Sequence, residues 1–162
     1  MKFGLTGDTH NNLASIKNIC EIFNKSNLDF VVHTGDITLP KSLIEFKQLE
    51  IPLLGVFGNN DQGDKQELQK VCRDNNFAFD DGIKKLSIAE KEIIIVHDPN
   101  DLDESHFDKA DIIVHGHTHR FRDEKINNCS VFNPGECAGF FKGKNSIGIV
   151  DLFKSKMEII KF

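Results

Sequence analysis

Short apolar segments alternate with helical patterns through the first half of the chain, and this alternation limits the fold more than any other feature. Three strand-length apolar runs each end in glycine and polar residues: 3–6, 30–32 and 53–57. Apolar side chains recur at helical spacing in residues 13–23 and 40–49, and a more polar helix is expected at 65–74. This β-α-β-α-β-α order predicts a largely parallel sheet with right-handed crossovers.

The second half of the chain is richer in strand patterns. Residues 83–88 and 93–96 flank Glu90-Lys91 and predict a hairpin. A short helix is expected at 103–108, and further strands are expected at 112–114, 130–132, 147–152 and 156–160. The whole pattern predicts an α/β fold in one domain, residues 1–162. Two sheets would form a β-sandwich flanked by helices, in four layers of the order α/β/β/α.

Composition and charge narrow the class of protein. The net charge is −5 with both signs interspersed, which makes nucleic acid a weak candidate partner. No apolar run approaches the ~20 residues that cross a membrane, and the N-terminus turns polar too early for a signal peptide. None of the four cysteines belongs to a Cys-x-x-Cys pair. We therefore expect reduced thiols and a cytoplasmic protein without membrane partners.

The ends of the apolar runs carry residue types that bind metal ions. These clusters are Asp8-x-His10, Gly35-Asp36, Gly58-Asn59-Asn60-Asp61, His97 and Gly116-His117-Thr118-His119. Parallel strands bring their carboxyl ends to one edge, so these distant segments are expected to converge. Carboxylate, amide and imidazole groups favour manganese, iron, zinc or nickel over a soft metal. Asp36 is our candidate bridge between two ions, which about 3.5–4 Å apart would generate a bridging hydroxide for an in-line displacement.

Each cluster also has a simpler interpretation as turn or cap chemistry. Asp-Thr-His and Gly-Asp are common turn sequences, and residues 58–61 would serve equally as a loop and helix cap. His97 would ordinarily be a polar strand end, and Gly116-His117-Thr118-His119 is the strongest single cluster. Only the ordered conjunction of five strand ends with ligand chemistry favours a metal centre over ordinary turns.

As a set, these motifs resemble the calcineurin-like metallophosphoesterase superfamily. The resemblance is to its small bacterial and archaeal phosphodiesterase branch, which includes the YfcE-like proteins, and it covers nearly the whole chain. It rests on residues 7–11, 33–36, 58–59, 97, 116–119 and the later Asn133-Pro134-Gly135. The resemblance implies a two-sheet sandwich flanked by helices, in agreement with the pattern of strands and helices.

The resemblance also implies a dinuclear metal site and the residues that form it. The first ion would be held by Asp8, His10 and His119. The second ion would be held by Asn59, His97 and His117, and Asp36 would bridge the two. Both are expected to be divalent, with Mn²⁺ the leading candidate and Ni²⁺, Fe²⁺ or Zn²⁺ as alternatives.

Three positions depart from the family pattern. Asn60 replaces a histidine that contacts the phosphate and can protonate the leaving group, and an amide delivers no proton at neutral pH. We therefore expect good leaving groups, or protonation by Asp61, by water or by the substrate. Asp98 replaces the more usual glycine, so that its carboxylate would lie in an outer shell or repel an anionic substrate. Glu136 replaces the usual serine, and its effect is open.

Three further segments have more than one interpretation. His33 and His115 lie within strand patterns, where each is expected to pack or to support a ligand through a hydrogen bond. Phe140-Phe141 lies in a glycine-flanked loop. This pair is expected to pack into the core or its own loop, with a subunit contact of a homo-oligomer as the alternative.

These observations give one leading hypothesis and two alternatives. The leading hypothesis is a dinuclear phosphodiesterase that acts on a small phosphodiester at an open site, with Asn60, Asp61 and His117 as candidate catalytic residues. The first alternative is a non-catalytic scaffold for protein–protein interaction, as in the retromer subunit that resembles this branch. That subunit has an eroded ligand set, whereas all seven ligand positions are present here. The second alternative is a nuclease, which the charge disfavours.

Overall fold

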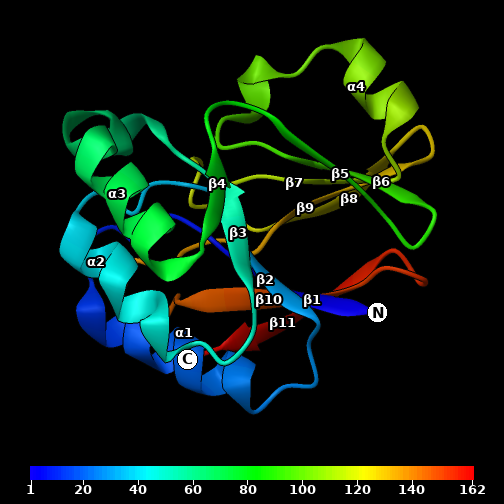
Figure 1. Ribbon diagram of the computed structural model, residues 1–162. Helices are drawn as coiled ribbons and strands as arrows, with labels where there is room; N and C mark the ends of the chain where they lie inside the picture. The colour runs from blue at the N-terminus through cyan, green and yellow to red at the C-terminus, as the bar shows by residue number, and fades with distance from the viewer.

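The computed structural model describes residues 1–162, and its strands form two sheets (Figure 1). The first sheet has six strands in the order β11-β10-β1-β2-β3-β4. Its parallel part consists of β1 (Lys2–Thr6), β2 (Phe30–His33), β3 (Leu53–Val56) and β4 (Ala78–Asp80). The antiparallel part consists of β10 (Ser146–Asp151), which pairs with β1, and β11 (Lys156–Lys161).

The second sheet has five strands in the order β5-β6-β7-β9-β8. The expected hairpin is formed by β5 (Lys84–Ile88) and β6 (Lys91–Ile95). The parallel neighbours of β6 are β7 (Ile112–Val114) and then β9 (Cys129–Asn133). The last strand, β8 (Arg122–Ile126), pairs antiparallel with β9 and forms the edge.

Helices cover the outer faces of both sheets. The first sheet is covered by α1 (Leu13–Asn24), α2 (Pro40–Glu45) and α3 (Lys65–Asn75), whereas α4 (Glu104–Lys109) lies beyond the second sheet (Figure 1). Short 3₁₀ helices lie at Phe46–Gln48, Asn59–Asp64 and Pro99–Asp101. None of the helices has the length and apolar character needed to span a bilayer. The predicted α/β/β/α order is confirmed.

Three apolar clusters hold these layers together. The cluster between the sheets joins Phe3 and Leu5 of β1 to Ile95 of β6 and Phe132 of β9. A larger cluster of 16 buried residues lies between the first sheet and its helices, and a smaller one lies under α4. Each fully buried large apolar side chain contributes about 1.5–3 kcal/mol. The strand ends are therefore fixed by a packed interior on both faces of the first sheet.

The start of α1 is tied to a loop that is remote in the sequence. Asn12 caps this helix, because its Oδ1 accepts a hydrogen bond from the Ser15 backbone N–H at 3.1 Å. The Asn12 side-chain amide also donates to the carbonyl of Ala138 at 2.7 Å. Asn12 thus links α1 to the connection between β9 and β10, which borders the site described below.

Two strands and one helix end differ from the sequence-based expectation. The strand patterns do not predict β4 or β8, because most of their side chains are exposed and carry no apolar alternation. The helix expected at 40–49 is α2 followed by a 3₁₀ turn, because Leu49 already adopts an extended backbone that leads into β3. All four cysteines are free and buried, as expected for thiols.

Candidate metal centre

Parallel strands of both sheets have their carboxyl ends beside one site. Asp8 follows β1, and Asp36 and Asn59 follow β2 and β3, while His97 and His117 follow β6 and β7 of the second sheet. The backbone N–H of His117 donates to Asp8 Oδ1 at 3.0 Å, which connects the second sheet to the first. The structure therefore brings all of the candidate ligands to one rim.

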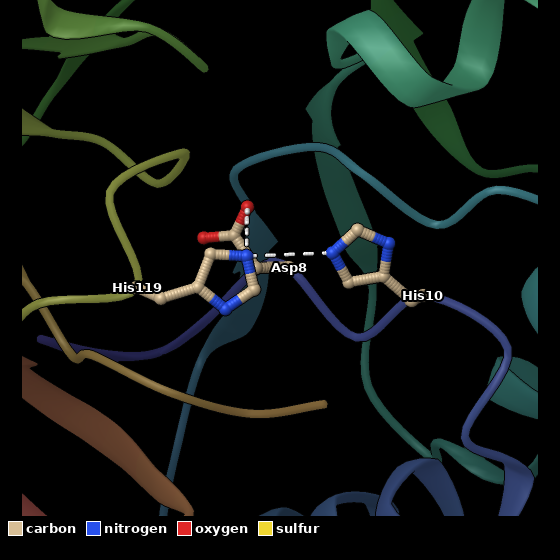
Figure 2. Close-up of side chains that lie close together, drawn as sticks. All are labelled: Asp8, His10 and His119. Carbon is tan, nitrogen blue, oxygen red and sulfur yellow. Dashed lines mark hydrogen bonds and ion pairs between the residues drawn. The ribbon is translucent and has the colours of Figure 1, made fainter. Parts of the chain in front are cut away.

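The first group of candidate ligands is Asp8, His10 and His119 (Figure 2). The Nε2 atoms of His10 and His119 are 3.4 Å apart, and His119 Nε2 is 3.9 Å from Asp8 Oδ1. Figure 2 shows both rings and the carboxylate turned toward a common point. Asp8 Oδ2 is buried and has no hydrogen-bond partner. An unpaired buried carboxylate oxygen is costly, and a bound cation would satisfy it.

The second group gathers around His97. Its Nε2 atom lies 2.9 Å from Asn59 Oδ1 and 3.2 Å from His117 Nδ1. It also lies 3.4 Å from Asp36 Oδ1. His97 Nδ1 donates to the carbonyl of Thr34 at 2.9 Å, so Nε2 of the neutral ring presents its lone pair to these atoms. Acceptor atoms that face one another in this way suit a shared cation.

Two carboxylates lie at the junction of the two groups. Ligand atoms of Asp8, Asp36 and His97 lie within 4.8 Å of one another, so Asp8 belongs to both groups by distance. Burial raises the pKa of Asp8 to about 6, although His97 and His119 oppose this rise. Burial also acts to raise the pKa of Asp36, but the neighbouring His97 and hydrogen bonds from Asn60 outweigh it and hold that pKa below its usual range.

Asn60 and Asp61 lie at the same rim but in different environments. Asn60 is exposed, and its side-chain amide donates to Asp36 Oδ2 at 2.7 Å. Asp61 is fully buried and accepts four backbone N–H bonds of 2.6–3.0 Å, which come from Asp36, Ile37, Thr38 and Gly58. Burial raises the pKa of Asp61, and the amide donors oppose this rise. This geometry favours a role in holding two loops over delivery of a proton.

Strained backbone is concentrated at this rim. Positive φ angles of 46° to 66° occur at five of the candidate ligands: Asp8, His10, Asp36, His117 and His119. Residues other than glycine rarely adopt this left-handed conformation, which costs about 1–3 kcal/mol each and clusters at functional sites. The segments Asp8-Thr9-His10 and His117-Thr118-His119 have the same local geometry, since in each a threonine separates two left-handed ligands.

Glycine is required where the loops approach most closely. A Cβ atom on Gly58 would lie 2.2 Å from Asp36 Oδ1 and 2.5 Å from the Asp36 backbone nitrogen. A Cβ atom on Gly116 would lie 2.8 Å from Asp8 Oδ2. The two glycines therefore leave room for the central carboxylates.

Two carboxylates contact the outward nitrogen atoms of candidate ligand histidines. Glu136 is 3% exposed, and its Oε2 accepts a hydrogen bond from His119 Nδ1 at 2.6 Å. Asp98 Oδ2 lies 3.6 Å from His117 Nε2. These are the residues that replace serine and glycine of the family pattern, and the sequence alone assigned neither of them to a particular histidine. In the sequence, the only sign that these two residues matter is that they differ from the family pattern.

Buried polar residues brace the ligand loops from beneath. His33 Nδ1 accepts from the Gly35 N–H at 3.1 Å, so its Nε2–H donates to Thr9 Oγ1 at 3.0 Å and ties the loops after β1 and β2. Asn133 donates to the carbonyl of Gly116 at 3.1 Å and supports the loop after β7. His115 Nδ1 donates to that same carbonyl at 3.0 Å. Burial lowers the pKa of His33 to about 3 and that of His115 to about 4.

Comparison with known proteins identifies the family. Residues 1–155 match the family model described as the calcineurin-like phosphoesterase superfamily domain. The chain belongs to this superfamily. A curated member, phosphodiesterase MJ0936 of Methanocaldococcus jannaschii, is 32% identical over 163 aligned residues, which cover 96% of each chain.

Three solved structures share the fold of this chain. A structure described as a novel archaeal phosphodiesterase has a TM-score of 0.88 and 31% identity over 100% of both chains. The phosphoesterase YfcE of E. coli has a TM-score of 0.74 and 20% identity, covering 99% of this chain and 98% of its own. A Vps29 variant from Entamoeba histolytica has a TM-score of 0.67 and 18% identity over 100% of this chain and 99% of its own. The last two likenesses concern the fold alone.

Proposed function

We propose that residues 1–162 form a single phosphodiesterase domain that holds two divalent ions, with manganese the leading candidate. Asp8, His10 and His119 would hold one ion. Asn59, His97 and His117 would hold the other, with Asp36 between them. Bound there, the ions would supply Lewis acidity and an activated water at neutral pH. The observation that carries this proposal is the pair of facing acceptor groups around the unpartnered, buried Asp8 Oδ2.

The protein residues around the two groups would orient the substrate. Asn60 is exposed at the rim, where its amide could donate to a phosphate oxygen instead of to Asp36. Asp61 would hold the loops after β2 and β3 in place through its four amide bonds. Neither residue is arranged to protonate a leaving group. Since general acid catalysis contributes about 10²–10⁴-fold, diesters with good leaving groups should react best.

A small diester is the proposed substrate class. The curated relative of 32% identity is named a phosphodiesterase. The net charge of −5 disfavours the extended phosphate contacts of a nuclease. We therefore expect turnover of small diesters and little binding to DNA or RNA.

The direct test is hydrolysis of bis(4-nitrophenyl) phosphate with added Mn²⁺ or Ni²⁺. Activity should appear with metal and disappear with a chelator. Asp36→Ala and His117→Ala should each lower kcat/KM by about 100-fold or more, because each removes a candidate ligand. The matched controls Asp64→Ala and His106→Ala lie outside the rim and should keep full activity. Full activity in both ligand variants would refute the assignment.

The alternative proposal is a non-catalytic scaffold, which is supported by the fold that this chain shares with Vps29. The complete ligand set favours the enzyme. Metal analysis of the purified protein at saturating Mn²⁺ separates the two: two ions per chain support a dinuclear enzyme, whereas fewer than one supports the scaffold. Asp36→Ala should lower the bound metal content if the enzyme is correct.

A further inference from the structure

Three hollows border the candidate metal centre, beside His10, His119 and His117, and the last two are also lined by acidic or basic side chains. The hollow beside His119 has a volume of about 570 Å³ and extends over Phe121, Phe141 and the end of β11. The hollow beside His117 has a volume of about 370 Å³ and extends past Asp98. A phosphodiester has two arms on one phosphorus atom. A phosphate between the two groups could therefore direct one arm toward the hollow beside His119 and the other toward the hollow beside His117.

The hollow beside His119 is aromatic. The chain has four exposed phenylalanines, and Phe121 and Phe141 of this lining are 58% and 61% exposed. Phe140, which is 65% exposed, packs its ring 5.2 Å from that of His10 and 5.6 Å from that of His119. Exposed aromatic rings grouped beside a polar centre are typical of a ligand site. The rings could stack on a planar group of a substrate.

The same hollow is basic, although the chain as a whole is acidic. Lys144 and Lys161 line it, and neither forms an ion pair; the lysines and arginines that do are Lys65, Lys84, Lys91, Arg122 and Lys154. Glu136 also borders it, but its carboxylate is held by His119 and by the N–H of Phe140. Two unpaired ammonium groups beside aromatic rings complement an anion attached to a planar group.

The hollow beside His117 has the opposite character. Asp98 and Asp101 line it, and it contains no lysine or arginine. An anionic arm would be repelled there. The two hollows therefore distinguish the two arms of a diester by charge.

We propose that the hollow beside His119 binds one arm of the substrate, and that this arm is an aromatic or heteroaromatic ring bearing a second anionic group. The ring would lie against Phe121 and Phe141, and the anion would pair with Lys144 and Lys161. The other arm, uncharged or cationic, lies in the hollow beside His117. This inference rests on the proposed phosphodiesterase function and narrows it to an asymmetric diester.

The test compares two diesters that release the same 4-nitrophenolate. Their second arms are phenyl and 4-carboxyphenyl. With Mn²⁺, the wild-type protein should prefer the carboxylated diester by about tenfold in kcat/KM, mainly through KM, since two exposed ion pairs are worth about that much. The double variant Lys144→Met/Lys161→Met should bring the ratio to about one. Phe141→Ser should weaken binding of both diesters by about threefold to tenfold.

Matched controls lie elsewhere on the surface. Lys156→Met changes the other end of β11, and Phe153→Ser removes the exposed phenylalanine that borders a different cavity. Both should keep the wild-type ratio. Calorimetric binding of 4-carboxyphenyl phenyl phosphate, compared with diphenyl phosphate, gives a readout without turnover. Equal affinity for the two, or a ratio unchanged in the double variant, overturns the inference. Charge-selective binding without any hydrolysis would contradict only the proposed function.

Discussion

Glu136 shows how one side chain can set the orientation of a ligand. Its carboxylate accepts from His119 Nδ1, which fixes the ring so that Nε2 faces Asp8 and His10. A carboxylate in this position also makes the imidazole more basic toward a metal. Asp98 lies in a similar position beside His117, but its carboxylate is farther from the imidazole, at 3.6 Å. Each group of candidate ligands therefore has one acidic neighbour behind a histidine.

Glu136→Gln is expected to weaken Mn²⁺ binding by about 10–100-fold, because the amide keeps the shape but loses the charge that orients His119. Competition with a chelating dye measures this dissociation constant directly. Glu158→Gln, on the exposed face of β11, is the matched control and should bind Mn²⁺ as the wild type does. Wild-type affinity in Glu136→Gln would show that the bond is structural only.

At the residue scale, the sequence locates candidate ligands better than their supports. Asp8, Asp36 and His97 are found because each lies two or three residues beyond the end of a strand, so that topology alone brings them together. Glu136 is noticed only as a departure from the family pattern, and its supporting role is not predicted, because its partner His119 is 17 positions away and lies across a loop. Its flanking residues Gly135 and Cys137 are buried, and a buried charged residue nearly always has a partner. The burial of its neighbours therefore predicts that Glu136 has a polar partner, but it does not identify that partner as His119.

At the scale of elements, the loops after β2 and β3 act as one unit. Asp61 joins them, because its two oxygen atoms bind the amides of both loops. Asn60 adds a link from the second loop to the Asp36 carboxylate. The candidate ligands Asp36 and Asn59 are thereby held in register with each other.

Asp61→Asn is expected to lower the free energy of unfolding by about 2–3 kcal/mol, because its NH₂ group would face backbone N–H donors. Urea denaturation of the metal-free protein measures this loss. Asp64→Asn, in the same 3₁₀ helix, should leave stability nearly unchanged. If Asp61 were instead the proton donor, Asp61→Asn would abolish turnover at unchanged stability, and that result would contradict the holding role.

Most of the elements that the sequence predicts have a buried face, although α4, β5 and β11 contain no fully buried residue. The helix α1 has apolar side chains at helical spacing, and the strands β1, β2 and β7 are short apolar runs. In each of them the apolar pattern matches the burial. The two unpredicted strands are β4 and β8, which lie at the edges of the two sheets. The other two edge strands, β5 and β11, alternate between exposed and half-buried side chains and are predicted. By contrast, β4 has only three residues and β8 exposes its three middle residues, so hydrogen bonding rather than apolar burial defines them.

For the molecule as a whole, stability should depend on pH through two buried histidines. The pKa is lowered to about 3 in His33 and to about 4 in His115. The unfolded chain binds these protons at about pH 6.5. Between about pH 6.5 and 4, protonation therefore favours the unfolded state, and stability falls as the pH falls. Asp8 opposes part of this loss, because its raised pKa of about 6 lets the folded state take up a proton first.

His33→Gln isolates one of these contributions. In a chelating buffer, the free energy of unfolding of the wild type should fall more steeply than that of His33→Gln between about pH 6.5 and 4. The expected difference is about 1.4 kcal/mol per pH unit. Denaturant unfolding curves across this range supply both slopes, and equal slopes would contradict the assignment of a neutral, buried His33.

The left-handed backbone conformation at the candidate ligands affects how quickly the protein can bind its ions and become active. Because packed sheets and the hydrogen bonds that brace the loops impose this contorted shape on the rim, capture of the ions should require no large rearrangement. Loading would then be limited by the arrival of cations rather than by reshaping of the chain. A protein built in this way can exchange one divalent species for another as their availability changes, while its framework stays the same.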